Sequence, residues 1–170
     1  MKVIIATDGS LNAKKAARLG ASLADESDEV IVLTVVEVPR QLLEAIRSAS
    51  GLGSDGVISP NVGLGTATEG PGDSRGWIGD DAVIARYIDD QRETRTGALA
   101  AELAAQGVTN VRTLVRDSEN VAAEILNVAA AEDVDVVCIG TLGLGRFEGL
   151  LGSISTKVAR GAKCSVLLVR

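Results

Sequence analysis

The sequence predicts a doubly wound α/β domain with a five-stranded parallel sheet, and two observations support this. Five short apolar runs alternate with amphipathic segments along the 170 residues, and this alternation is typical of repeated β–α–β units. The apolar runs contain few polar residues, as expected for parallel strands covered by helices on both faces. Right-handed crossovers and an early β–α–β unit favour the strand order 3-2-1-4-5.

The first part of the chain supplies two strands and one helix. Residues 2–7 form a β-branched run that ends at Asp8, which predicts a buried strand and then a turn. Ser10 is predicted to cap the helix that follows, because apolar residues recur after it at helical spacing. Residues 29–39 form a second apolar run and predict the second strand. A short helix is expected over residues 41–49.

Residues 50–79 interrupt this pattern. They contain nine of the nineteen glycines and two of the three prolines, with almost no hydrophobic periodicity. Such a composition does not provide enough apolar surface for a packed element. We therefore expect a glycine-rich surface insert within a single domain that spans residues 1–170.

The second part of the chain supplies three more strands, each preceded by a helix. Gly107 is a natural C-cap for the first of these helices, and the strand that follows alternates as strands near a sheet edge do. The predicted helices cover residues 80–106, 117–132 and 153–161, and the predicted strands cover residues 108–116, 133–140 and 164–170.

Composition excludes several classes of function. The chain has no histidine, which removes histidine-based triads, histidine-ligated zinc and imidazole acid–base chemistry. A net charge of −6 and only three aromatic residues argue against nucleic-acid binding. No apolar run approaches the length of a signal peptide core or a membrane span. We therefore expect a cytoplasmic protein without membrane insertion, in which Cys138 and Cys164 are buried in strands.

The segment GTLGLGRFEGLLGS, residues 140–153, lies between a predicted strand and a predicted helix. Glycines at such a place let the backbone approach an anion at the helix N-terminus. No lysine precedes Ser153, as a Walker A motif requires, and only ATDGSLN follows the first strand, where a Rossmann motif would lie. The pattern alone leaves two interpretations open, a phosphate cradle and a structural turn with a helix cap.

Two motifs together resemble the universal stress protein family. One is TDGS at residues 7–10, directly after the first strand. The other is G-x-x-G after a later strand, then a short segment, Gly-Ser and a final strand. The resemblance covers residues 1–51 and 91–170, nearly all the chain outside the insert.

The resemblance implies an adenine-nucleotide site. In the nucleotide-binding branch of the family the loop is G-x2-G-x9-G-S/T, whereas this chain has only eight residues between Gly143 and Gly152. We therefore expect the adenosine end of the site to be retained more surely than the grip on the γ-phosphate. By position, the resemblance implies nucleotide contacts at Ala6, Thr7, Asp8, Val35, Ile139, Gly140, Gly143, Gly152, Ser153 and Ile154, with Val35 at the adenine and the last four at the phosphates.

The first hypothesis is therefore a stress-response regulator that binds ATP or a related adenine nucleotide, with Mg²⁺ accompanying the triphosphate. Little or no hydrolysis is expected, since Asp8 is the one candidate base. No catalytic residue and no protein metal ligand is assigned, and the client protein is not identified by the sequence. The last strand, residues 164–170, is apolar, and both its exposure in a monomer and the resemblance imply a homodimer through that edge.

Two alternatives remain open at this stage. In one, the glycines are structural and the protein is a non-nucleotide interaction module that uses the 50–79 insert. The shortened loop favours this alternative, whereas the intact Gly152-Ser153 pair opposes it. In the other, the protein is an enzyme acting on nucleotides or activated adenylates, since fold alone does not decide function. The missing histidine and loop lysine make an enzyme the weakest of the three.

Overall fold

The computed structural model describes residues 1–25, 27–39, 78–141 and 152–170. The helix predicted over residues 41–49 and nearly all of the predicted insert lie outside these ranges. The chain separates into two compact units, one made of Met1–Glu37 and Ile88–Arg170 and the other of Val38–Tyr87. The first unit contains all the strands described below, and the single domain over residues 1–170 stays a prediction.

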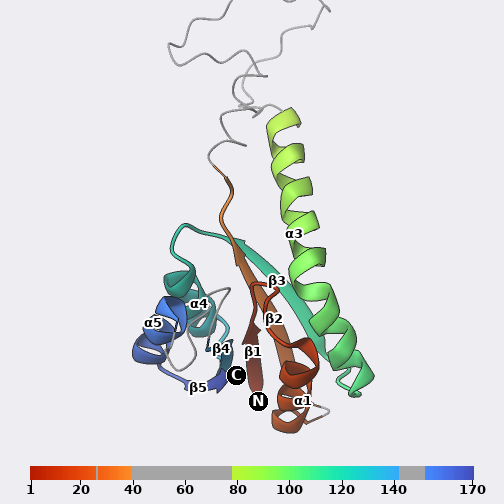
Figure 1. Ribbon diagram of the computed structural model, residues 1–170, viewed down its shortest axis with the longest axis vertical. Helices are drawn as coiled ribbons and strands as arrows, with labels where there is room; N and C mark the ends of the chain where they lie inside the picture. Colours follow the sequence, from red (N-terminus) through yellow and green to blue (C-terminus); the bar gives the residue numbers. More distant parts are fainter. Residues whose placement is uncertain (26, 40–77, 142–151) are drawn as a thin grey trace, which may run out of the picture. The chain divides into compact units, whose positions relative to one another are not determined.

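One five-stranded parallel sheet forms the centre of the first unit (Figure 1). Its order is β3-β2-β1-β4-β5, so β1 is central and pairs with both β2 and β4. The predicted fold class and strand order are therefore confirmed. The strands are β1 (Lys2–Ala6), β2 (Glu29–Val36), β3 (Val111–Asp117), β4 (Val136–Gly140) and β5 (Ser165–Val169).

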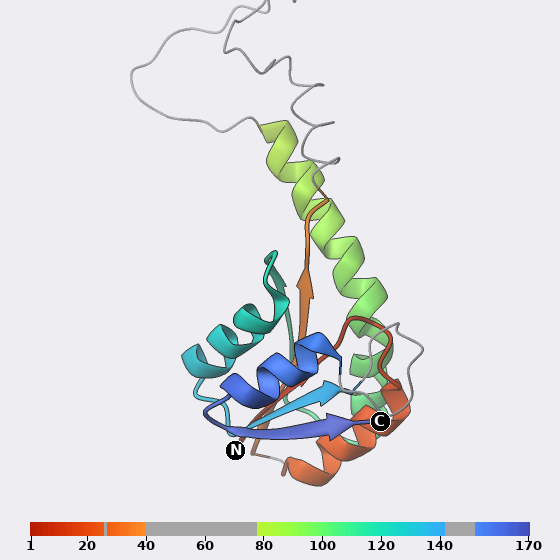
Figure 2. The same cartoon turned by 60° about the vertical axis from the view of Figure 1, so that its left-hand side comes forward.

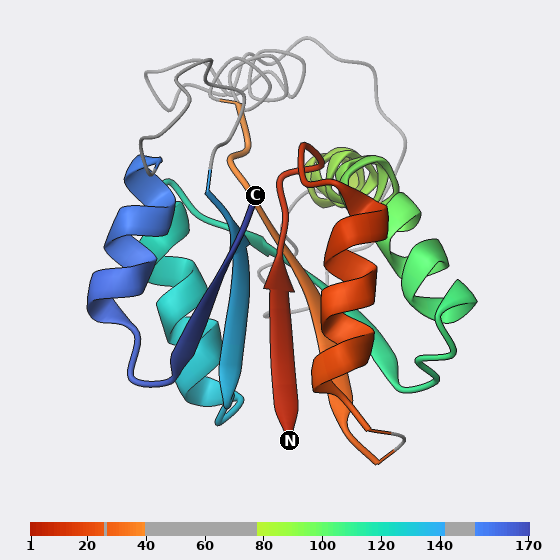
Figure 3. The same cartoon turned by 60° about the horizontal axis from the view of Figure 1, so that its bottom comes forward.

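Helices cover both faces of the sheet (Figure 3). Helix α1 and the C-terminal part of α3 pack on one face, whereas α4 and α5 pack on the other. Each crossover between parallel strands thus returns through a helix, as parallel pairing requires. The helices are α1 (Ala13–Leu23), α3 (Ile78–Ala105), α4 (Val121–Ala131) and α5 (Ser153–Gly161).

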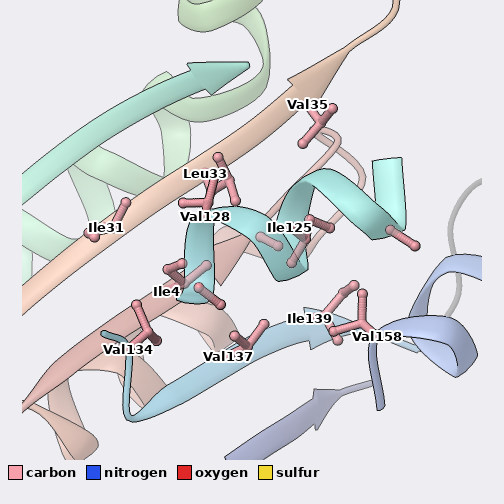
Figure 4. Packing of buried hydrophobic residues seen from close by; sticks show 13 residues of the cluster. Ile4, Ile31, Leu33, Val35, Ile125, Val128, Val134, Val137, Ile139 and Val158 are labelled. Atoms are coloured by element: carbon pink, nitrogen blue, oxygen red, sulfur yellow. The ribbon is translucent and has the colours of Figure 1, made fainter. Parts of the chain in front are cut away.

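The two faces of β1 bury alternate side chains in separate apolar clusters. Ile4 belongs to the cluster under α4 and α5, whereas Val3 and Ile5 belong to the cluster under α1 and α3. Figure 4 shows Ile4 directed into the first cluster together with Val128 of α4 and Val137 of β4. This two-sided burial explains why the strand reads as an unbroken apolar run.

The start of α1 differs from the prediction. Asn12, rather than Ser10, caps the helix, because its Oδ1 accepts a hydrogen bond from the Lys15 N–H at 3.0 Å. Ser10 is bound elsewhere: its N–H and its hydroxyl both donate to Oδ1 of Asp8, at 2.9 and 2.6 Å. The carboxylate of Asp8 thus organises its own turn, and the helix begins only after that turn is complete.

Helix α3 ends as predicted but begins earlier. Gly107 has a φ of +85°, and its N–H donates to Ala104 O at 3.0 Å while the Val108 N–H donates to Leu103 O at 3.1 Å. This pair of bonds is a Schellman motif, which confirms Gly107 as the residue that ends the helix. Residues 78 and 79, which were expected in the insert, are already helical.

Smaller differences concern the other elements. The strand predicted from residue 108 begins at Val111, and it lies at the sheet edge as expected. Helix α4 begins at Val121 after Asn120, whose Oδ1 accepts from the Ala123 N–H at 3.2 Å. Its predicted start at residue 117 is therefore four residues early, because β3 extends through Asp117. The bounds of α5 agree with the prediction.

Charged side chains gather at the amino ends of the strands. Arg112 binds Glu29 and Glu132 at 2.8 Å each, and Lys2 lies 3.3 Å from Glu132 and 3.6 Å from Glu29. The guanidinium of Arg112, followed by the ammonium of Lys2, lowers the pKa of Glu132 below its usual value. Such partly exposed pairs add little stability individually, but together they balance charge at this end of the sheet.

Both cysteines are free, and Cys138 is buried in β4. Burial raises the pKa of the Cys138 thiol to about 11, so the reactive thiolate is disfavoured at neutral pH. Among the residues that the structure describes, no helix combines the length and the apolar character needed to cross a bilayer.

Replacing a buried isoleucine of β2 tests the two-sided core. Ile31 is fully buried, and Ile31→Ala is expected to lower the free energy of unfolding by about 2–5 kcal/mol. Ile154→Ala is the matched control, because that side chain is 40% exposed, and we expect a change below about 1 kcal/mol. Urea unfolding followed by circular dichroism measures both, and equal losses would contradict the core as described.

Candidate functional site

The central strand β1 ends before its two neighbours, β2 and β4. Ala6, its last residue, lies opposite Leu33 in β2 and Ile139 in β4. Thr7 follows and donates its N–H to Leu33 O at 2.9 Å, after which the chain leaves the sheet. The chain leaves β1 toward β2 on one side of the sheet and leaves β4 toward β5 on the other side. This switch point brings together four residues for which the resemblance implies nucleotide contacts: Ala6, Thr7, Ile139 and Gly140. Crevices at such switch points are the usual ligand sites of open α/β sheets.

β2 continues beyond the end of β1. Val36 O on its β3 side accepts from the Ser118 N–H at 3.0 Å. Since alternate residues of a strand direct their N–H and C=O groups to the same side, those of Val35, like those of Leu33, face the β1 side. No hydrogen bond from the Val35 N–H to another described residue is present. Among the described residues, the Val35 N–H is thus a backbone donor without an acceptor at the point where β1 has ended.

The side chain of Val35 contributes to an apolar floor below this edge. It is 6% exposed and belongs to the same cluster as Ala6 and Ile139. Figure 4 shows Val35 at the carboxyl end of β2 and Ile139 at that of β4. The strand ends therefore place buried apolar side chains beside polar backbone groups, and small-ligand sites usually combine these two kinds of group.

The turn from Thr7 to Ser10 presents one acid. The Gly9 N–H donates to the Thr7 hydroxyl at 3.0 Å, and Asp8 Oδ1 accepts from Ser10 as described above. Asp8 is exposed, and its carboxylate can accept further hydrogen bonds. The turn therefore fixes the position of one anionic acceptor beside the end of β1.

The start of α5 contains Gly152 and Ser153, the Gly-Ser pair of the second family motif. Gly152 is the N-cap residue, and no side chain of a described residue caps this helix end. Ser153 and Ile154 are exposed in the first turn, so the helix presents backbone N–H groups and the positive end of its dipole. Such an end attracts an anion, although by itself it does not identify one.

Two hydrogen bonds hold the start of α5 against the end of β4. The Gly152 N–H donates to Thr141 O at 2.7 Å. Ser155 is 2% exposed, and its hydroxyl lies 2.9 Å from Gly152 O and 3.3 Å from Thr141 O. The two residues that flank the segment 142–151 are therefore bonded directly to each other.

Gly143 and the rest of the segment 142–151 lie outside the described residues, so the structure does not place the shortened part of the loop. The other nine residues named by the resemblance are described. Six lie at the ends of β1, β2 and β4 or in the turn after β1, and three lie at the start of α5. In the described part of the chain, no three side chains of His, Cys, Asp or Glu gather as a metal site.

Arg95 of α3 is a residue at this edge that sequence reasoning missed. Its Nη1 donates to Val35 O at 3.3 Å, and its Nε donates to Gln91 Oε1 at 2.9 Å. The sequence around it, DDQRETRTG, is charged on all sides and gives no sign of an inward-facing cation. Only the approach of α3 to the end of β2 reveals the contact.

Removing the Ser155 hydroxyl tests the bond between β4 and α5. Ser155→Ala is expected to lower the free energy of unfolding by about 1 kcal/mol, because a buried hydrogen bond is lost. Ser22→Ala is the matched control, since its hydroxyl makes the same kind of bond to Leu19 O at 2.8 Å but is exposed. Chemical unfolding compares the two variants, and an equal effect would show that Ser155 holds nothing specific.

Comparisons with known proteins agree with this architecture. The model of the universal stress protein family matches residues 70–170. Universal stress protein YxiE of Bacillus subtilis strain 168 is 28% identical over 176 residues, which cover 99% of this chain and 98% of that protein. A universal stress protein solved in complex with cAMP has a TM-score of 0.57 at 17% identity, with 100% of this chain and 97% of that chain covered.

A further solved structure, the universal stress protein from Archaeoglobus fulgidus in complex with dAMP, has a TM-score of 0.51 at 16% identity. The match covers 100% of this chain and 98% of that chain. These structures share the fold, whereas the family match includes the start of α5 and the final strand. The chain belongs to the universal stress protein family.

Proposed function

We propose that the protein binds an adenine nucleotide at the carboxyl ends of β1, β2 and β4 and acts as a cytoplasmic regulator in the stress response. The observation that supports this most strongly is the Val35 N–H, which has no acceptor among the described residues and lies beside its own C=O where β1 has ended. A ligand that satisfies both groups would complete the sheet edge. The related structures solved with cAMP and dAMP support an adenine nucleotide as that ligand.

The backbone of Val35 complements one edge of adenine. Its N–H is a donor and its C=O is an acceptor that has two lone pairs. On the Watson–Crick edge of adenine, N1 accepts and the N6 amino group donates, and enzymes commonly read bases along this edge. The apolar floor formed with Ala6 and Ile139 would support the ring. We therefore assign the base to the β2 end of the site.

The remaining groups follow the strand order. Asp8, in the turn after β1, would accept hydrogen bonds from the ribose hydroxyls, and the first turn of α5, after β4, would receive a phosphate. Base, ribose and phosphate thus extend along β2, β1 and β4 in the order in which the strands lie in the sheet. Among the described residues assigned to the site, Asp8 is the one acid and is engaged with the ribose in this assignment, so we propose little or no hydrolysis.

The two related ligands each carry a single phosphate, as their names state. The largest ligand that we propose is ATP with Mg²⁺. The Mg²⁺ ion would bind mainly to the phosphates of ATP. Because the chain has one residue fewer between Gly143 and Gly152 than the family loop, we propose a weaker hold on the γ-phosphate. AMP and ATP should therefore bind with similar affinity.

Replacing the acid of the turn tests the site. Asp8→Asn retains an oxygen that can accept from Ser10 but removes the charge, and we expect about tenfold weaker binding of AMP. Asp133→Asn is the matched control, because Asp133 is exposed, precedes β4 at the amino ends of the strands and has a φ of 51°, which asparagine tolerates.

Isothermal titration with AMP measures both variants and the unaltered protein. Chromatography of the denatured protein shows in addition whether an adenine nucleotide co-purifies. A protein that neither retains nor binds adenosine, AMP or ATP would contradict the proposed function. Loss of binding in Asp133→Asn equal to that in Asp8→Asn would contradict the role of Asp8.

We also propose a homodimer through β5. In the described part of the chain, β5 pairs with β4 alone and forms the sheet edge (Figure 2). Leu168 on this strand is 36% exposed, although it is a large apolar residue. Pairing of two β5 edges would cover both the open backbone groups and this side chain.

A charge on the edge strand tests the dimer. Leu168→Lys is expected to convert a dimer to a monomer, since lysine on an edge opposes strand pairing. Ile154→Lys is the matched control, because Ile154 is exposed to a similar extent but lies on α5, and it should leave the dimer intact. Size-exclusion chromatography with light scattering gives the mass, and a monomeric unaltered protein would contradict the proposal.

A further inference from the structure

The guanidinium of Arg95 is held at the base end of the proposed site by two directional bonds. Nη1 donates to Val35 O and Nε donates to Gln91 Oε1, one helical turn earlier. The side chain is partly buried, so its reach is limited. An arginine carries five N–H donors in a rigid fork, and these two contacts use two of them. No other described residue accepts from the remaining three.

The turn after β1 passes beside α3 at Arg95. Gly9 in this turn has a φ of +91°, and a Cβ atom added there would lie 3.4 Å from Arg95 Cα and 3.5 Å from Arg95 Cγ, which is ordinary van der Waals contact distance. Arg95 is therefore next to the turn after β1, and its guanidinium binds the end of β2. The proposed site lies between these two strand ends.

The chemistry of adenine specifies what a donor at this position would meet. The N6 amino group lies between two acceptors, N1 on one side and N7 on the other. If N1 accepts from the Val35 N–H while N6 donates to Val35 O, then N7 lies on the side of the carbonyl away from the N–H. Arg95 binds the same carbonyl oxygen and offers donors that match an acceptor such as N7.

We propose that Arg95 is a base-recognition residue that donates a hydrogen bond to N7 of adenine while it holds the Val35 carbonyl. This inference rests on the proposed nucleotide site. With Arg95, the edge of β2 presents a row of donor, acceptor and donor to the N1, N6 and N7 groups of the ring. Guanine fits this row poorly, because its O6 is an acceptor where adenine has an amino donor.

Adenosine and 7-deazaadenosine, in which a C–H group replaces N7, isolate this contact. Because neither compound carries a phosphate, the start of α5 does not affect the comparison. The unaltered protein is expected to bind 7-deazaadenosine about tenfold more weakly than adenosine, as for the loss of a hydrogen bond to a charged donor. Arg95→Met, measured by isothermal titration, is expected to bind the two compounds with equal affinity.

Arg92→Met is the matched control. Arg92 lies one turn earlier on the same helix, is exposed, and pairs with Asp89. Its replacement removes the same charge from α3 and should preserve the tenfold preference for adenosine. Thermal unfolding confirms that each variant is folded.

Arg95→Lys serves as the second variant if Arg95→Met does not fold. Lysine can still donate to Val35 O, but it lacks the planar fork that serves two acceptors in fixed geometry. The preference for adenosine should fall to about threefold or less. An unchanged preference in either Arg95 variant would overturn the inference.

The outcomes separate this inference from the proposed function. A protein that binds neither adenosine nor AMP refutes the nucleotide site and the role of Arg95 with it. A protein that binds adenosine without preferring it over 7-deazaadenosine retains the site but refutes the contact to N7. A loss of AMP binding in Arg95→Met, with the preference for adenosine over 7-deazaadenosine retained, would assign Arg95 to the phosphate and overturn its role at the base.

Discussion

The candidate site depends on an unequal pair of strands. β1 has five residues and β2 has eight, and the two begin opposite each other at Lys2 and Glu29. The difference in length therefore falls entirely at the carboxyl end. β3 accompanies β2 to Val36, whereas β4 ends level with β1 apart from one residue. The sheet thus has a step between β2 and β1, and Val35 lies on the open side of that step.

Within the described part of the chain, this step leaves one backbone donor unpaired, and the ligand that we propose would remove the cost. A buried peptide N–H without a partner costs about 1–3 kcal/mol, so strand edges inside a sheet are normally paired. The Val35 carbonyl accepts a hydrogen bond from Arg95, but no described residue accepts from the Val35 N–H. The planar base that we propose, with adjacent acceptor and donor groups, would supply what the missing continuation of β1 would have supplied. Binding would then complete the edge of β2.

The turn after β1 favours glycine at position 9 because of its backbone conformation. Any residue with a side chain would pay about 1–2 kcal/mol for the left-handed backbone of Gly9, whereas its Cβ would reach only ordinary contact distance from Arg95. The TDGS motif therefore serves two purposes in the structure. Asp8 organises the turn and remains available as an acceptor, and Gly9 supplies the left-handed conformation with which the turn passes beside α3.

The sequence predicted the fold well because the fold depends on burial. The apolar runs of β1, β2 and β4 are buried on both faces, and such runs determine both the strands and their parallel pairing. Serine is a common N-cap residue, so the sequence favoured Ser10. In the structure, Ser10 donates its hydroxyl and its N–H to Asp8, and Asn12 caps the helix instead. Arg95 was not predictable, because a helical charge acquires its role only from the strand end that it contacts.

The two ends of the proposed nucleotide site also depend on different parts of the structure. The start of α5 is fixed by bonds between described residues, since Gly152 and Ser155 both bond to Thr141 O. These bonds close the base of the segment 142–151 whatever its length. We therefore expect a loop one residue shorter than the family pattern to leave the proposed anion position at the helix start unchanged and to affect only groups that lie beyond it. For this reason the number of residues in the loop bears on the outer phosphates of a ligand, whereas the base and ribose depend on β2, β1 and α3.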